Sequence, residues 1–287
     1  MSIQLAYLTQ NSQFDAILQG VIGLLEIVFP GRIRAYYLTG SLTNGTAVYG
    51  SDIDVIIVFK DELPDDVAER CHQVGLLTTL ISSIRVDLAA RSEAELLQVG
   101  ATGVKLSTQL LYGEDIRDHI PFEPLEQFRH HIIRGFVFYI KELRGTPDSL
   151  IYPLAYPDTS DLFFGYTRRG IWHGNRRHEP GTRLLLNAVT LGATLRVLLA
   201  SGIRCSSKME AILRYQELIA DDWTDWLMAL FKQCKLKWGH RVPEDPAGQS
   251  HLRELLQHAL VFENDVLRCC RPFLDESISV IFKEEAT

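Results

Sequence analysis

Residues Tyr36–Phe59 read YYLTGSLTNGTAVYGSDIDVIIVF, and this segment determines the fold of the first part of the chain. Its first residues are mostly aromatic or β-branched, and they belong to a strand that is expected at Ile33–Thr39. Its nearly continuous apolar end predicts a second, buried strand at Ile53–Phe59, and glycines with other turn formers fill the connection Gly40–Ser51. The segment therefore predicts two strands joined by a turn, with Asp52 where the second strand begins.

Small and acidic residues around this turn have the arrangement needed to hold a nucleoside triphosphate on metal ions. Asp52 and Asp54 lie two positions apart on a strand, so both carboxylates emerge on one face, roughly 7 Å apart at Cα. This separation suits two divalent ions about 4 Å apart, and ligands made only of oxygen favour Mg²⁺. Gly40 lets the backbone approach a phosphate, and Ser41 with the N–H groups after it can donate to anionic oxygens. The residues predict a site for two Mg²⁺ ions and a triphosphate.

The order Gly40-Ser41, ten further residues, then Asp52-x-Asp54 resembles the nucleotidyltransferases of the DNA polymerase β superfamily. That superfamily takes a third carboxylate from a later strand, and Asp87 has the matching setting on the polar face of the alternating segment Ile84–Leu88. The resemblance implies that Asp52 and Asp54 bind the metals. It implies that Asp87 completes the metal site, accepts the proton of the attacking hydroxyl, or does both. A polar residue on the open face of an edge strand also accounts for Asp87.

The periodicity of the remaining chain predicts two domains. Residues 1–120 are expected to form an α+β nucleotidyltransferase domain, a small mixed sheet with helices packed against it, and residues 121–287 an all-helical domain. The expected elements of the first domain are a helix over Phe14–Val28, strands at Ile33–Thr39, Ile53–Phe59, Ile84–Leu88 and Gln109–Tyr112, and helices at Asp65–Ser82 and Ser92–Gly100. The expected helices of the second are Leu125–Leu143, Leu162–Trp172, Leu184–Ala200, Lys208–Ile219, Trp223–Lys237 and Ser250–Phe273.

A second resemblance covers more of the chain. The two-domain plan and the segment Leu110–Arg117 are similar to the aminoglycoside adenylyltransferases that modify streptomycin and spectinomycin. Thr194-Leu195-Arg196, Gly202 and Ser207-Lys208 resemble the helix–loop–helix of that family. The resemblance implies ATP as co-substrate, with Arg196 and Lys208 neutralising its phosphates. An arginine at the solvent edge of a helix and a lysine that caps a loop are the plainer interpretations of these two residues.

The acceptor is less well defined, because the sequence departs from that family. Aminoglycosides are polycations, yet Pro180–Leu184, just before the Arg196 helix, contains no acidic residue. The nearest acids are Glu179 upstream and Asp221, Asp222 and Asp225 downstream. A small hydroxyl-bearing molecule is the expected acceptor, and an aminoglycoside, with antibiotic resistance as the role, is one candidate. A protein-modifying (AMPylating) nucleotidyltransferase and a non-catalytic nucleotide-binding regulator are the alternatives.

Charge and composition restrict the partners. The net charge is −7, from 15 acidic and 8 basic residues in 1–120 and 21 of each in 121–287. This balance disfavours nucleic acid as a partner and a template-directed polymerase as the activity. The Arg168–His173 segment matches the Arg-x4-His spacing of the HEPN ribonucleases, and it overlaps a local basic cluster made of Arg168, Arg169, Arg176 and Arg177.

The chain is expected to be cytoplasmic and without a membrane partner. Leu184–Ala200 is the longest apolar stretch, but Asn187, Thr190 and Arg196 interrupt it, which favours a buried helix over a membrane span. Met1–Gln13 has no basic region and no long apolar run, so no signal peptide is expected. The five cysteines are odd in number and lack C-x-x-C spacing, which is typical of reduced thiols.

Overall fold

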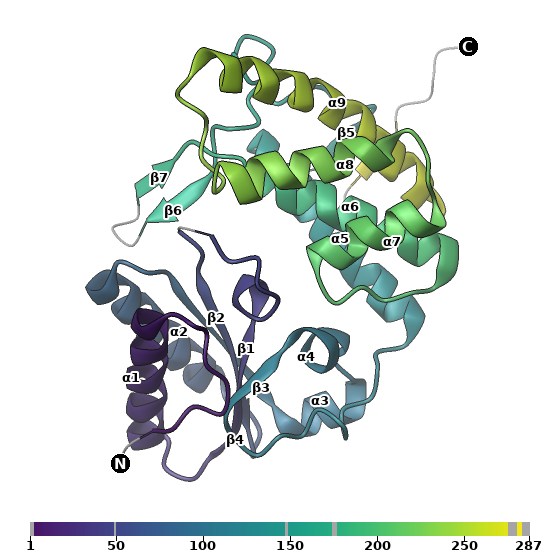
Figure 1. Cartoon of the computed structure of the whole chain (residues 1–287). Helices are drawn as coiled ribbons and strands as arrows, with labels where there is room; N and C mark the ends of the chain where they lie inside the picture. Colours follow the sequence, from purple (N-terminus) through teal and green to yellow (C-terminus); the bar gives the residue numbers. More distant parts are fainter. Residues whose placement is uncertain (1–2, 49, 147–148, 174–176, 275–279, 283–287) are drawn as a thin grey trace. The chain divides into compact units, whose positions relative to one another are not determined.

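β1 (Ile33–Thr39) and β2 (Ile53–Phe59) pair antiparallel at the centre of a four-stranded sheet in the computed structural model of the protein (Figure 1). The structure describes residues 3–48, 50–146, 149–173, 177–274 and 280–282. The strand order is β3-β2-β1-β4, in which β3 (Val86–Ser92) runs parallel to β2 and β4 (Gln109–Gly113) runs antiparallel to β1. The predicted mixed sheet is therefore confirmed.

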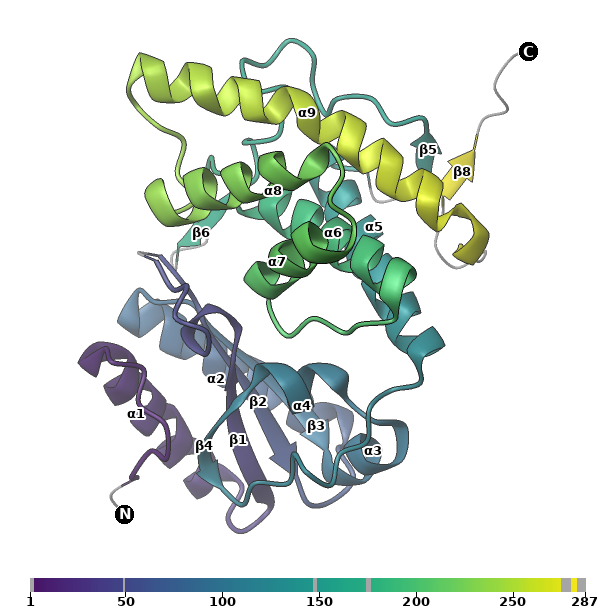
Figure 2. The same cartoon turned by 45° about the vertical axis from the view of Figure 1, so that its right-hand side comes forward.

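Helices cover both faces of this sheet (Figures 1 and 2). α1 (Ser12–Val28) and α2 (Asp65–Ser82) pack on one face, and α3 (Glu93–Val99) and α4 (Thr102–Ser107) contribute to the smaller core on the other. α1 begins at a cap in which the Asn11 side chain accepts hydrogen bonds from the N–H groups of Gln13 and Phe14. The predicted α+β layering of the first domain is confirmed.

The alternation of side chains along β2 determines where its acidic residue points. Val55 and Ile57 belong to the core under α1 and α2, whereas Val58 belongs to the core on the α3 and α4 side. Because side chains two positions apart share a face, Asp54 lies on the same face as Val58. In β3 the buried residues again alternate with less buried ones, and Asp87 is one of the half-buried ones. Both carboxylates therefore leave the larger core and point to the other face.

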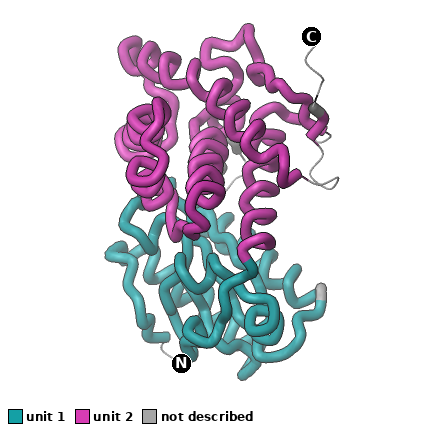
Figure 3. Tube along the Cα trace, turned by 90° about the vertical axis from the view of Figure 1, so that its right-hand side faces the viewer, with its two compact units in different colours: residues 1–124, 172–177 teal, residues 125–171, 178–287 magenta. Residues whose placement is uncertain are grey.

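The chain divides into two compact units, residues 1–124 with 172–177 and residues 125–171 with 178–287 (Figure 3). The second unit is helical, as predicted, with one large core. Its helices are α5 (Leu125–Arg144), α6 (Arg183–Ser201), α7 (Lys208–Leu218), α8 (Trp223–Phe231), the π-helix η2 (Lys232–Lys237), α9 (Pro246–Cys270) and the 3₁₀ turn η3 (Arg271–Phe273). Short strands occur beside them, β5 (Leu150–Tyr152) paired with β8 (Val280–Phe282) and β6 (Ile171–His173) paired with β7 (Arg177–Glu179).

α6 is the central helix of the second unit. Within the described residues it is the one helix whose length and apolar character would suit a membrane span, and 61% of that stretch is buried inside the structure. Its buried side chains belong to the large core. The prediction of a buried core helix is confirmed, and the apolar composition is explained by packing against its neighbours.

The predicted helix at Leu162–Trp172 is wrong. The segment forms a series of turns that leads into β6. The carboxylate of Asp161 accepts hydrogen bonds from the N–H groups of Phe163 and Gly165, at 2.8 and 3.2 Å. Phe164 and Gly165 both have positive φ, 56° and 79°, which a right-handed helix does not allow. A side chain that binds the local backbone has thus replaced the helical hydrogen bonds.

The ends of two other predicted helices also differ. The helix expected over Trp223–Lys237 changes from α to π geometry after Phe231. The helix expected at Ser250–Phe273 begins at Pro246, because the Asp245 side chain accepts a hydrogen bond from the N–H of Gly248 and Pro246 suits the first helical position. Both differences reflect local geometry that periodicity does not report.

Candidate active site

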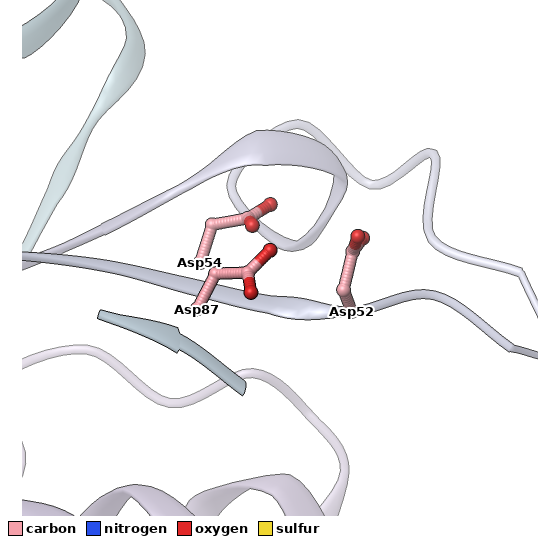
Figure 4. Close-up of side chains that lie close together, drawn as sticks. All are labelled: Asp52, Asp54 and Asp87. Atoms are coloured by element: carbon pink, nitrogen blue, oxygen red, sulfur yellow. The ribbon is translucent and has the colours of Figure 1, made fainter. Parts of the chain in front are cut away.

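Asp52, Asp54 and Asp87 come together at one end of the parallel pair β2 and β3 (Figure 4). Asp54 and Asp87 are directly paired in the register of the two strands, and Asp52 lies two residues before Asp54. One carboxylate oxygen from each residue lies within 4.8 Å of the others, and all three residues are half-buried. The register of β2 and β3 therefore brings together three carboxylates from two distant parts of the sequence.

Gly40 is required by the position of Asp54. It follows the last residue of β1, where Thr39 pairs with Asp54, and it has a φ of 78°. A Cβ atom on this glycine would lie 2.5 Å from Oδ2 of Asp54. The approach of a phosphate is the expected reason for this glycine, and a second role is visible in the structure, which is to leave room for a carboxylate of the cluster.

The turn between the two strands is fixed by short-range hydrogen bonds. Ser41 lies in the 3₁₀ turn η1 (Gly40–Leu42), and its carbonyl accepts from the N–H of Thr46 at 3.2 Å. At the other end, the hydroxyl of buried Ser51 accepts from the N–H of Val48 at 2.8 Å, immediately before Asp52. The predicted use of the Ser41 hydroxyl on phosphate stays a prediction, and the turn that would present it is well defined.

Arg85 is a site residue that the sequence analysis did not identify. Its guanidinium pairs with the carboxylate of Asp87 at 2.7 Å, and both side chains are 41% exposed. Burial lowers the pKa of Arg85, but the charges of Asp87, Asp52 and Asp54, with the hydrogen bond to Asp87, raise it overall. The signal was present in the alternation of Ile84–Leu88, which places residues 85 and 87 on the same polar face. A cation already belongs to the acidic cluster.

The donor set fits a hard divalent cation. Three carboxylates supply only oxygen ligands, they lie close enough to share ions, and their half-exposed position leaves room for phosphate oxygens and water. Because like charges this close repel one another, a cation stabilises the arrangement. The cluster could therefore hold Mg²⁺ through Asp52, Asp54 and Asp87.

Arg196 and Lys208 occupy neighbouring helices of the second unit. The guanidinium of Arg196, on α6, pairs with Asp221 at 3.1 Å, and the hydroxyl of Tyr215 donates to the same carboxylate oxygen at 2.9 Å. Lys208 is the first residue of α7, and its ammonium group donates to the side-chain oxygen of Asn187 on α6. Both cations thus have partners within the helical unit, and their contact with nucleotide phosphates stays a prediction.

The Arg168–His173 segment does not lie on a helix. Arg168 belongs to the turns before β6, and its guanidinium pairs with Asp158 and Asp161 of the same region. Arg176, another member of the basic cluster, lies outside the described residues. The ion pairs give Arg168 a structural role in holding these turns together.

Comparisons with known proteins identify the first domain. Residues 25–108 match the family model described as nucleotidyltransferase domain, which confirms the first resemblance. Among solved structures, the spectinomycin adenyltransferase AAD(9) from Enterococcus faecialis, with ATP and spectinomycin, is 12% identical with a TM-score of 0.49, over 84% of this chain and 98% of that one. A toxin-antitoxin with AMP-PNP is 21% identical with a TM-score of 0.26, over 34% of this chain and 76% of that one. No curated protein sequence matches the chain.

Proposed function

We propose a specific reaction for the nucleotidyltransferase domain formed by residues 25–108: Mg²⁺-dependent transfer of a nucleoside monophosphate, AMP from ATP, to a hydroxyl group of a small molecule. The observation that carries this proposal is the meeting of Asp52, Asp54 and Asp87 beside the Gly40 turn. A nucleotidyltransferase has to neutralise a triphosphate and orient its α-phosphorus toward an acceptor. Three convergent carboxylates next to a glycine turn provide ligands for both tasks.

Each residue has a separate part in the proposed mechanism. Ser41 and the N–H groups that follow it bind the β- and γ-phosphates, and the expected part of Arg196 and Lys208 in neutralising phosphate charge stays a prediction. The acceptor oxygen attacks the α-phosphorus in line, a new P–O bond forms, and the bond to the bridging oxygen breaks, so that pyrophosphate leaves. Asp87 accepts the proton of the attacking hydroxyl. Mg²⁺ held by Asp52, Asp54 and Asp87 supplies charge neutralisation at the phosphates.

A label experiment tests this reaction. The protein is incubated with Mg²⁺ and ATP labelled on either the α- or the γ-phosphate, with streptomycin, spectinomycin and other aminoglycosides as the first acceptor panel. Label should pass to a small-molecule product from α-labelled ATP and never from γ-labelled ATP, and mass spectrometry should find the adenylylated product. Transfer from γ-labelled ATP would instead mean phosphoryl transfer and would contradict the proposal.

Two variants make the assay specific for the carboxylates. Asp54→Asn should lower the transfer rate by at least about 10³-fold, because it removes a carboxylate ligand of the Mg²⁺ that would neutralise the reacting phosphates. Asp61→Asn is the matched control, since Asp61 is exposed and pairs only at the surface with Arg32, so its rate should stay within about twofold. Label that becomes acid-precipitable with a protein would identify a protein acceptor, and nucleotide binding with no transfer to any acceptor would favour the regulator.

A further inference from the structure

A second charged cluster lies at the N-terminal end of α6, within the helical unit. The N–H of Thr182, the residue before α6, donates to the carbonyl of His240 at 2.9 Å. The N–H of His240 donates to the carbonyl of Cys234 at 2.7 Å, and the N–H of Gly239 to that of Lys235 at 3.1 Å. Backbone hydrogen bonds thus hold the start of α6 against the end of the π-helix. His240 and Lys235 are each only 4% exposed.

Two further cations, Arg183 and Lys208, belong to the first turns of α6 and α7. Arg183 is the first residue of α6, and Asn187 lies four residues later on the same face of the helix. The ammonium group of Lys208 reaches that face and donates to the side-chain oxygen of Asn187, a neutral partner. The charges of Arg183, Lys208 and Lys235 all act on His240, whose backbone is held at the start of α6, and the first turn of α6 contains no acidic residue.

His240 lies among these cations as a neutral group. Burial, together with the charges of Arg183, Lys208 and Lys235, lowers the pKa of its imidazole to about 2. Its Nδ1 atom is buried and has no hydrogen-bond partner among the residues that the structure describes. A buried polar atom without a partner is costly, and such atoms commonly mark a place where something else binds.

We propose that Arg183, Lys208, Lys235 and His240 form a binding site for a phosphoryl group at the N-terminus of α6. The positive end of a 19-residue helix attracts an anion, and two cations of the cluster come from other elements, α7 and the π-helix. A neutral imidazole can donate one N–H to the anion, which gives the buried Nδ1 a partner in its protonated tautomer. The same charges disfavour a polycation, so this end of the helical unit does not suit an aminoglycoside.

The bound phosphoryl group can come from either of two molecules. The choice between these two molecules rests on the proposed function, whereas the existence of the site does not. It belongs either to the β- and γ-phosphates of the nucleotide or to a phosphate carried by the acceptor. The chemistry of recognition is the same in both cases. The site itself depends on residues of the helical unit and not on the carboxylates of the first domain.

Inorganic pyrophosphate is the probe for the site. It is titrated by calorimetry into the full-length protein in the presence of EDTA, so that no divalent cation can bridge it to the carboxylates. Lys235→Met should weaken pyrophosphate binding about tenfold or more, because it removes a charged donor. Lys232→Met is the matched control, an exposed lysine three residues earlier on the same π-helix, and should leave the affinity unchanged. No binding to the wild type, or equal binding to both variants, would overturn the site.

Further variants separate this inference from the proposed function. Arg183→Gln, at a half-buried position, should weaken pyrophosphate binding in the same way and serves as the readout if Lys235→Met does not fold. The double variant Asp52→Asn/Asp54→Asn should lose transfer and keep pyrophosphate binding, and loss of binding in this variant would contradict a site confined to the helical unit. If Lys235→Met weakens metal-free ATP as much as pyrophosphate, the nucleotide supplies the phosphoryl group. If ATP binding is unchanged, the acceptor supplies it.

Discussion

The carboxylate cluster of the first unit and the cation cluster of the second both bring like charges together, in different surroundings. Asp52, Asp54 and Asp87 are half-buried at one end of the parallel pair β2 and β3, where Arg85 already pairs with one of them. Lys235 is almost fully buried, beside a neutral His240. In the first cluster solvent and a counter-ion offset the repulsion. In the second, one of the three cations, Lys235, lies in the interior.

Different features of the structure control the two clusters. A half-exposed carboxylate keeps its charge at modest cost, so strand register alone is enough to build the first cluster. A buried charge costs several kcal/mol unless polar groups surround it, so the second cluster depends on packing and on the protonation state of its neighbour. The first cluster should therefore respond most to changes in backbone geometry, and the second to pH.

The largest expected effect comes from disturbing the geometry of the carboxylate cluster. Gly40→Ala introduces a Cβ that would lie 2.5 Å from the carboxylate of Asp54, in a backbone with a φ of 78°. Asp54 has to move, and a displacement of about 1 Å can lower a rate by roughly 10²-fold. The strained backbone should also lower the free energy of unfolding by about 1–3 kcal/mol. Transfer kinetics and urea unfolding measure the two effects.

Gly45→Ala is the matched control for that substitution. Gly45 lies in the same connection with a similar φ of 68°, but an added Cβ would meet nothing within 4 Å. Gly45→Ala should lower the free energy of unfolding as Gly40→Ala does, because the backbone strain is similar. Its transfer rate should stay largely unchanged. If both variants lost activity equally, the conformation of the turn, and not the contact with Asp54, would control the site.

The next effect concerns the second cluster and depends on pH. The pKa of His240 is lowered from 6.5 to about 2 in the folded protein, so below pH 6.5 the unfolded chain binds a proton that the folded chain does not. The free energy of unfolding is therefore highest above pH 6.5. It decreases as the pH falls below 6.5, by at most about 1.4 kcal/mol per pH unit. Urea unfolding between pH 7 and 5 measures the slope.

Two variants identify the group responsible for the slope. His240→Gln should reduce the loss of stability between pH 7 and 5, whatever its effect at neutral pH, because it removes the group that titrates. His251→Gln should leave the slope almost unchanged, since His251 is 43% exposed. An identical slope in the wild type and in His240→Gln would show that His240 does not stay neutral among the cations.

Sequence reasoning predicted the first cluster because its information is local. The apolar run of Ile53–Phe59 fixes β2, and a period of two places Asp52 and Asp54 on one face. Asp87 was predicted because the resemblance implies a third carboxylate on a later strand, and the alternation of Ile84–Leu88 places it on the polar face. The sequence does not give the register between β2 and β3, which makes Asp54 and Asp87 direct neighbours and so completes the cluster.

The second cluster could not be predicted in the same way. It joins residues 183, 208, 235 and 240, which belong to different helices and a loop, and no spacing in the sequence relates them. The wrong helix at Leu162–Trp172 has a related cause, because a hydrogen bond from the Gly165 N–H to Asp161 competes with helical periodicity. Arg85 is an intermediate case: its face was predictable, but its pairing with Asp87 is a matter of side-chain geometry.

The smallest expected effect tests the counter-ion of the carboxylate cluster. Arg85 pairs with Asp87 while both are 41% exposed, and such pairs are worth about 0–1 kcal/mol. If this guanidinium competes with a divalent cation for the carboxylates, Arg85→Gln should tighten Mn²⁺ binding in the absence of nucleotide by about threefold to fivefold. Electron paramagnetic resonance of free Mn²⁺ measures the change, with Arg91→Gln on the exposed side of the same strand as control. Weaker Mn²⁺ binding in Arg85→Gln would mean that the arginine holds Asp87 in place for the metal, so that the pair would be part of the ligand geometry and not a competitor for it.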